Sequence, residues 1–171
     1  MRLMFAVLPV LTTALTVVGA QAATTKAGGG KAASPPDLRV WSIARSEDTY
    51  ALRLALPRQA DPAFAITCQP SARLLQIAVE VKNHRIASGD AVPLSLSNGK
   101  RRLELAATAF FGSGNGDLVA EAAVALEPRV FDVLREGDIL TVKLPGETQM
   151  LPLAGARARL TDFERVCLAR R

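Results

Sequence analysis

The chain has 171 residues, of which 49% are hydrophobic and 22% charged, and its formal net charge is +5. This composition excludes collagen-like, coiled-coil and wholly disordered proteins, and the length is that of one ordinary domain. With one His, one Trp, one Tyr and two Cys, the chain offers few groups for catalysis, and no motif commits it to a reaction.

The first residues have the pattern of a cleaved secretory signal. Arg2 supplies a positive start, residues 3–19 are apolar, and Ala20-Gln21-Ala22 places small side chains where a signal peptidase requires them. An uncleaved membrane anchor is the alternative, because about 17 apolar residues reach the lower limit for spanning a bilayer. Pro9 and the small-residue exit favour cleavage near Ala22. We therefore expect residues 1–22 to be a signal peptide and the protein to be periplasmic or secreted.

The next segment, residues 23–37, is predicted to be a flexible leader. It contains three consecutive glycines, two prolines and no large apolar side chain, so it cannot bury enough surface to offset the entropy of ordering. The folded domain is expected over residues 38–171. A chain of this size can bury roughly 70% of its unfolded surface, which is enough for a core without metal.

Strand candidates with period-two alternation begin at Leu38. Residues 38–46 form the first, and residues 50–56 are the clearest half-buried strand. Glu47-Asp48 between them predicts a tight hairpin turn. Further strands are predicted at 64–68, 74–81, 92–96, 102–111, 118–126, 139–144 and 148–151, with Pro or Gly at or near most of their ends.

Two other segments are less regular. Residues 130–136, which end at Gly137, predict one or two helical turns. The alanine-rich residues 119–126 have high helical propensity. We nevertheless favour a strand there, because a turn precedes them and alternate side chains can line one face.

The C-terminal residues 155–168 predict an amphipathic helix. Their apolar side chains recur at intervals of three and four residues and fall on one narrow stripe, which consists of Ala156, Leu160, Phe163 and Cys167. Cys167 therefore lies on the predicted buried face of the helix.

Cys68 and Cys167 are the only cysteines, and an even count in an exported chain predicts an intramolecular disulfide between them. This bond would hold the last helix across the sheet. The wide spacing gives little support to a thioredoxin-like redox role. Two Cys and one His are also too few for a structural zinc site unless carboxylates complete it, so we expect no metal and no cofactor.

These elements predict a mainly β protein, a single antiparallel β-sandwich domain with a C-terminal amphipathic helix that the disulfide joins to the sheet. A parallel α/β fold is disfavoured, because no strand is followed by a crossover helix of adequate length.

Four features, taken together, define the layout of the chain. Trp41 lies on the first strand, a later strand ends in Cys68, a turn and strand follow at 136–142, and Leu153-Ala154-Gly155 leads into the helix that carries Cys167. In this layout the chain resembles small exported bacterial proteins related to the invasion-associated locus B family and to type VI secretion accessory proteins. It departs from the locus B pattern, which has additional cysteines near the first Trp. The resemblance implies a periplasmic β-sandwich with a disulfide-held helix, and it carries over no catalytic residue.

Candidate catalytic groups are sparse. His84 lies in a polar stretch near Asp90, but the chain has no G-x-S-x-G elbow, so an exposed loop histidine is favoured. Two pairs of carboxylates could serve glycoside hydrolysis, but few aromatic side chains are present to bind a sugar. These pairs are Glu127 with Asp132 and Glu136 with Asp138.

The glycine-rich residues 112–117 predict a flexible hairpin tip. They lack the lysine and the following helix of a phosphate loop, and their single carboxylate, Asp117, suits calcium poorly. Phe110 and Phe111 come directly before this tip and could form an exposed apolar patch. We consider them possible contacts with a partner.

The densest basic run follows a predicted turn and consists of Lys100, Arg101 and Arg102. It is a second possible partner contact, and the basic charge permits weak contact with an anionic membrane surface. No aromatic side chains alternate with it as a nucleic-acid stacking platform requires, so nucleic acid is not expected as a partner. The sequence identifies no small-molecule ligand.

The leading hypothesis is an exported, periplasmic, non-enzymatic protein that binds an envelope or host-facing protein. A small periplasmic hydrolase that uses His84 or the carboxylates is one alternative. An accessory protein of a secretion system is another, and its partner would be a secretion-system protein.

Overall fold

The computed structural model describes residues 37–99, 101–114 and 116–169. The predicted signal peptide and all of the predicted leader except Asp37 lie outside the described residues. Within the described part, no helix is long and apolar enough to cross a membrane.

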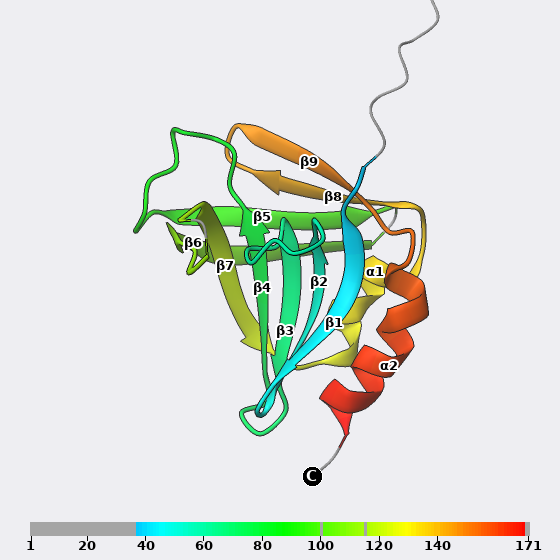
Figure 1. The fold of residues 1–171 in the computed structure, drawn as a ribbon. Helices are drawn as coiled ribbons and strands as arrows, with labels where there is room; N and C mark the ends of the chain where they lie inside the picture. Colours follow the sequence, from blue (N-terminus) through cyan, green and yellow to red (C-terminus); the bar gives the residue numbers. More distant parts are fainter. Residues whose placement is uncertain (1–36, 100, 115, 170–171) are drawn as a thin grey trace, which may run out of the picture. The chain divides into compact units, whose positions relative to one another are not determined.

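Nine strands form one continuous antiparallel sheet in the order β1-β2-β3-β4-β7-β6-β5-β8-β9 (Figure 1). The mainly β antiparallel fold is thereby confirmed. The strands are β1 (Val40–Ser46), β2 (Thr49–Ala55), β3 (Phe64–Gln69), β4 (Leu74–Glu80), β5 (Ala91–Asn98), β6 (Arg101–Phe111), β7 (Leu118–Ala125), β8 (Ile139–Leu144) and β9 (Glu147–Pro152).

The long strand β6 joins two parts of the sheet. Its residues 101–108 pair with β5, whereas its residues 108–111 pair with β7. Figure 1 shows that β5, β6, β8 and β9 run across the direction of β1 to β4. The two layers of the predicted sandwich are therefore parts of one hydrogen-bonded sheet that bends, and the core lies between them.

The strands form where side chains alternate between core and solvent. In β4, for example, Leu75, Ile77 and Val79 are buried and the residues between them are half-buried. The alanine-rich segment is a strand as predicted, because β7 buries Ala120 and Ala122 and pairs with β4 along its length. Period-two burial and pairing thus outweigh the helical propensity of alanine.

The predicted hairpin turn between the first two strands is also confirmed. Ser46 pairs with Thr49, so the turn contains only Glu47 and Asp48. Glu47 has φ 46°, which is a conformation that two-residue hairpin turns require. Leu56, by contrast, lies beyond the end of β2 and is exposed, although the alternation of residues 50–56 predicted its burial.

Three helical segments follow the pattern expected from the sequence. The short 3-10 helix η1 (Pro128–Phe131) leads directly into α1 (Asp132–Arg135), and α2 (Ala156–Leu168) is the C-terminal helix. The buried residues of α2 are those of the predicted stripe, Ala156, Leu160, Phe163 and Cys167. The ring of Phe163 meets the ring of Phe131 edge to face at a centroid distance of 5.9 Å, so α2 packs against η1.

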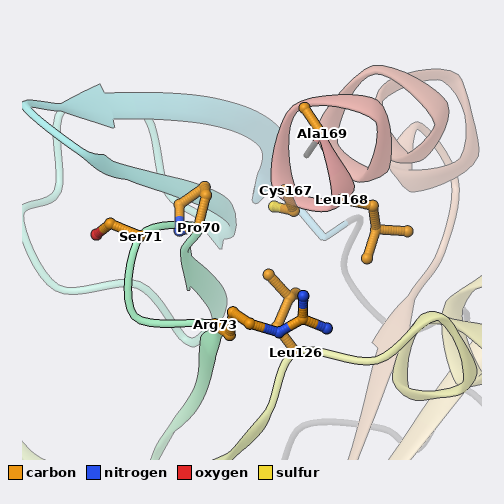
Figure 2. A pocket seen from close by; sticks show the side chains of 7 residues that line it. All are labelled: Pro70, Ser71, Arg73, Leu126, Cys167, Leu168 and Ala169. Carbon is orange, nitrogen blue, oxygen red and sulfur yellow. The ribbon is translucent and has the colours of Figure 1, made fainter. Parts of the chain in front are cut away.

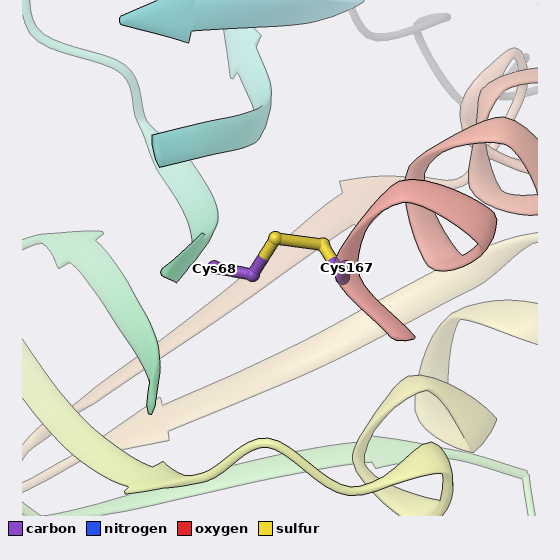
Figure 3. The surroundings of a disulfide bond; sticks show 2 residues. All are labelled: Cys68 and Cys167. Carbon is purple, nitrogen blue, oxygen red and sulfur yellow. A yellow bond between two sulfur atoms is a disulfide. The ribbon is translucent and has the colours of Figure 1, made fainter. Parts of the chain in front are cut away.

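A disulfide between Cys68 and Cys167 is present, as predicted, with 5.8 Å between the two Cα atoms. Figure 3 shows the bond running from the end of β3 to the last turn of α2. Both residues are buried. The C-terminal helix is therefore covalently joined to the sheet.

The first and last strands of the sheet meet through a side chain. Trp41 of β1 donates a hydrogen bond from its indole Nε1 to the carbonyl oxygen of Pro152 in β9, at 2.8 Å. The Trp41 ring is buried and packs edge to face on Phe64, with centroids 5.9 Å apart. A buried indole N–H normally finds such an acceptor, so this contact also holds the two edges in place.

A half-buried carboxylate, Glu121, lies on β7. It is opposite Ala78 of β4 and Thr108 of β6, and its Oε1 accepts a hydrogen bond from Gln76 Nε2 at 2.8 Å. Loss of hydration raises the pKa of Glu121, and the hydrogen bond from Gln76 opposes that rise. The fold therefore favours the protonated form of this side chain.

We expect Glu121→Gln to increase the free energy of unfolding only slightly at pH 7, because solvent still screens this half-buried carboxylate, and to change nothing near pH 3.5. Because burial raises the pKa of Glu121 in the folded state, its contribution to stability is present below the unfolded-state pKa. That contribution is lost as the pH rises through the folded-state pKa. Urea unfolding at both pH values measures the effect.

Glu104→Gln is the matched control, because a hydrogen bond from Arg102 lowers the pKa of Glu104. The stabilising contribution of Glu104 is present above the unfolded-state pKa and is lost as the pH falls through the folded-state pKa. Its dependence on pH is therefore opposite to that of Glu121. Equal pH trends in the two variants would contradict this account.

Candidate functional site

The predicted contact residues lie at the two ends of β6. Arg101 and Arg102 begin the strand, and Phe110 and Phe111 end it. At about 3.3 Å per residue the two groups are roughly 30 Å apart, so they form two separate surfaces. Lys100 lies outside the described residues.

The basic end of β6 is partly neutralised by its own strand. Arg102 is exposed and forms an ion pair with Glu104, whose carboxylate also accepts a hydrogen bond from Ser95 Oγ at 2.9 Å. Arg101 is exposed and pairs with Asn98 across the turn. This end therefore presents one arginine that is not held by a neighbouring carboxylate of the strand.

The other end of β6 exposes two aromatic side chains. Phe110 has 38% of its surface exposed and Phe111 has 67%. They are consecutive residues of a strand, opposite Val119 and Leu118 of β7, so their side chains point to opposite faces of the sheet. The two rings thus make this end of β6 apolar on both faces of the sheet, and they do not form one flat patch.

The glycine-rich tip that follows is held by a residue far away in the sequence. Gly112 N donates to Asp117 O at 2.8 Å and closes the tip. Gly114 N donates to both carboxylate oxygens of Asp61, each at 3.1 Å. Asp61 lies between β2 and β3, so this contact joins two loops that the sheet brings together at one end.

The two glycines allow the carboxylate to approach. A Cβ atom added to Gly114 would lie 2.7 Å from the Asp61 carboxylate oxygens, and one added to Gly112 would lie 3.2 Å from Oδ2. Sequence reasoning identified the glycines but missed Asp61, because its 53-residue separation from Gly114 leaves no local signal. The tip is an anion-binding turn whose anion belongs to the same chain.

We expect Asp61→Ala to increase hydrogen exchange of the backbone amides in residues 112–117 by about fivefold or more. The loss of a charge-assisted hydrogen bond removes roughly 1 to 3 kcal/mol of local stability, and a rate increase of this size corresponds to the low end of that range. Hydrogen exchange with mass spectrometry measures it.

Asp90→Ala is the matched control. Asp90 also accepts a backbone hydrogen bond in a loop, from Ala87 N at 2.8 Å, but its carboxylate accepts none from the described residues of the tip. Unchanged exchange at residues 112–117 in Asp61→Ala would show that the carboxylate does not hold the tip.

A cavity of about 400 Å³ lies at the base of this tip. Its apolar lining includes Ile86, Leu118 and the exposed Phe111, and polar groups lie beside them. Those polar residues are Glu80, Asn83, His84, Ser88 and Asp117. An aromatic ring next to hydrogen-bonding groups can receive one side chain or small group of a partner.

The structure does not gather the residues of the predicted hydrolase alternative in one place. His84 and Asp90 line two neighbouring cavities, and Asp90 is engaged with Ala87 N. His84 is exposed. Among the described residues, it makes no hydrogen bond to Ser88 or Asp117, which share its cavity.

Three of the four carboxylates suggested for glycoside hydrolysis form ion pairs with arginines, and among the described residues the fourth, Glu136, does not. Among them, Glu127 pairs with Arg129 at 2.5 Å and Asp138 pairs with Arg157 at 3.0 Å. Asp132 likewise accepts from Arg135, which also reaches Glu164 of α2.

Another cavity, of about 450 Å³, lies beside the disulfide (Figure 2). Leu126, Cys167 and Leu168 form its apolar part, and Arg73 reaches across it from the turn between β3 and β4. Arg73 lies near the C-terminal end of α2, where a cation is favourable. The arrangement offers one positive charge and no second polar group aimed at a shared point.

Within residues 37–99, 101–114 and 116–169, no group of three or more His, Cys, Asp or Glu side chains could hold a metal ion. The chain matches no protein-family model, no curated protein and no solved structure. The resemblance to the locus B family and the type VI accessory proteins stays a prediction.

Proposed function

We propose that the chain is an exported, non-enzymatic protein that binds an envelope protein through the end of the sheet where Phe110, Phe111 and the tip at residues 112–117 meet. The observation that carries this proposal is the strongly exposed Phe111 at the rim of a cavity. Exposed aromatic side chains beside a pocket are typical anchors of protein interfaces.

Hydrogen bonds on both sides of residue 115 support the same surface. The bonds from Gly114 to Asp61 and from Gly112 to Asp117 fix these described residues of the tip before any partner arrives. A surface that is already ordered loses little conformational entropy on binding. The free energy gained when a partner buries the two phenylalanine rings is therefore largely available for binding.

The compartment in this proposal comes from the predicted signal peptide and from the disulfide. Disulfides persist in oxidising compartments such as the bacterial periplasm. The same surface would serve an accessory protein of a secretion system, which differs from the main proposal only in the identity of the partner.

Site-specific photo-crosslinking in the native cells tests the proposal. A photoreactive residue in place of Phe111 is expected to give a discrete crosslinked product, and Phe110→Ala is expected to reduce it. Met150 is the matched control position, because 66% of its surface is exposed and it lies on β9. Equal products at both positions, or none at Phe111, would contradict the proposal.

A small hydrolase is the second candidate, because His84, Ser88 and Asp117 line one cavity. These are the residue types of a Ser-His-Asp triad, and a substrate could bring them into hydrogen-bond distance. Turnover of a chromogenic ester that Ser88→Ala and His84→Ala both abolish would favour this function over the binding protein.

A further inference from the structure

The two edges of the sheet differ in how they are covered. On β9, Glu147 Oε2 accepts hydrogen bonds from the backbone N–H groups of Lys82 and Asn83, each at 3.0 Å. Gln149 Nε2 donates to Glu80 O at 2.6 Å. The last residue of β9 is Pro152, which has no N–H group to offer a new strand. This edge is therefore closed by the chain itself.

Within the described part of the chain, strand β1 forms the other edge and pairs with β2 alone. Its seven residues pair in unbroken register and include no proline, no lysine and no bulge, which are features that usually protect an edge. The one charged residue of the strand, Arg45, lies near its far end, over the ring of Tyr50. Alternate backbone N–H and C=O groups of such a strand point away from its neighbour and can pair with an added strand. Val40 and Ile43 also have 51% and 39% of their surfaces exposed.

A groove lies next to this edge. The cavity has a volume of about 500 Å³ and separates the start of β1, at Arg39, Val40 and Trp41, from the beginning of α2. The residues on the α2 side are small, namely Ala154, Gly155 and Ala158, apart from Arg159. The groove is narrow at Gly155, where an added Cβ would lie 4.0 Å from Trp41 Cδ1, and small side chains keep the rest of its α2 side low.

The groove is positively charged. Arg39 and Arg159 both line it. Arg39 is held by Asp37, with 2.5 Å between Nη2 and Oδ2. Arg159 is exposed, and within the described part of the chain it forms no ion pair or side-chain hydrogen bond. A carboxylate brought into the groove would therefore meet a cation that is not already neutralised.

We propose that β1 accepts an extended segment of a partner protein as an additional antiparallel or parallel strand, and that an acidic side chain of this segment pairs with Arg159. Addition of a strand to a free edge is a known mode of peptide recognition, in which backbone hydrogen bonds give affinity and side chains give selectivity. This surface is separate from the Phe110–Phe111 end and goes beyond the function proposed above.

A second copy of the chain fits this edge less well. Residues 40–46 contain no acidic side chain, and the nearest acidic residues, Glu47 and Asp48, lie in the turn beyond Ser46. The chain as a whole carries a net charge of +5, which opposes self-association. Charge complementarity therefore selects an acidic segment from another protein.

The test uses the exported chain and synthetic seven-residue peptides with acetylated and amidated ends, so that only side chains carry charge. The peptides alternate valine and threonine, with a central glutamate in one and a central lysine in the other. In nuclear magnetic resonance titrations, the glutamate peptide is expected to shift the amide signals of residues 40–46 and to bind about fivefold more tightly than the lysine peptide.

N-methylation of the peptide separates strand addition from other modes of binding. Only one edge of an added strand faces β1, so methylation of one alternating set of backbone nitrogens should abolish binding, whereas methylation of the other set should leave it intact. If both sets abolish binding, or neither does, strand addition is wrong.

Charge reversal tests the role of Arg159. Arg159→Glu is expected to reverse the preference between the glutamate and lysine peptides, whereas Arg101→Glu, at an exposed arginine on β6, is expected to leave it unchanged. An unchanged preference in Arg159→Glu would overturn the assignment. Shifts at residues 40–46 that depend on protein concentration without peptide would show that a second copy occupies the edge.

The outcome is independent of the proposed function. Phe111→Ala is expected to leave peptide binding at β1 intact, and Arg159→Glu is expected to leave the crosslink at Phe111 intact. If glutamate peptide at millimolar concentration shifts no signal of residues 40–46, β1 is not a docking edge, and the proposal for Phe110 and Phe111 is untouched.

Discussion

Replacement of both cysteines, in Cys68→Ala/Cys167→Ala, is expected to lower the free energy of unfolding by about 4 kcal/mol. The bond joins residues 99 positions apart, and the chain-entropy description gives about 4.7 kcal/mol for a loop of that length. Urea unfolding measures the change through the midpoint, with the slope compared between the two proteins.

Reductant distinguishes the covalent bond from the packing of the two sulfurs. The unchanged protein should be destabilised by reductant, whereas the double alanine variant should unfold at the same midpoint with and without it. A loss below about 1 kcal/mol would mean that the packed stripe of α2 holds the helix on the sheet without help from the bond.

Phe163→Ala is expected to lower the free energy of unfolding by about 3 to 5 kcal/mol, even with the disulfide intact. Phe163 is buried in the middle of α2, and its ring contacts Phe131 of η1 edge to face. The substitution leaves a cavity between the helix and η1 because the disulfide at Cys167 prevents the helix from moving freely to fill it. Thermal and urea unfolding measure the loss.

Thr161→Ala on the same helix is the control. Thr161 is exposed, so its replacement should change stability by no more than about 0.5 kcal/mol. Similar losses in the two variants would show that the buried stripe does not determine how α2 packs.

Local patterning predicts most elements of this fold. Alternation of side chains predicts the strands because one face of each strand packs on the core, as in Leu75, Ile77 and Val79 of β4. The stripe of α2 is predictable for the same reason, at helical spacing. The disulfide follows from the number of cysteines, which leaves one possible intramolecular pair.

Contacts between distant loops are not predictable in this way. Asp61 holds Gly114, and Asn98 Nδ2 donates to the carbonyl oxygens of Val133 and Glu136 at the end of α1. Each contact joins segments at least 35 residues apart, and nothing in either segment alone indicates its partner. The candidate site shares this limit, since the sequence indicates Phe110 and Phe111 but not the cavity beside them.

The sequence by itself determined which local elements the protein contains. These are a predicted export signal, nine alternating strands, an apolar stripe on a helix and a single pair of cysteines. These are local properties, because burial of one face repeats every second or every third to fourth residue. Only the tertiary structure decided that Asp61 fixes the tip and that, among the described residues, the β1 edge is unpaired while the β9 edge is covered. These features follow from the order of the strands and the bending of the sheet. They depend on which distant segments meet, and no single segment determines that.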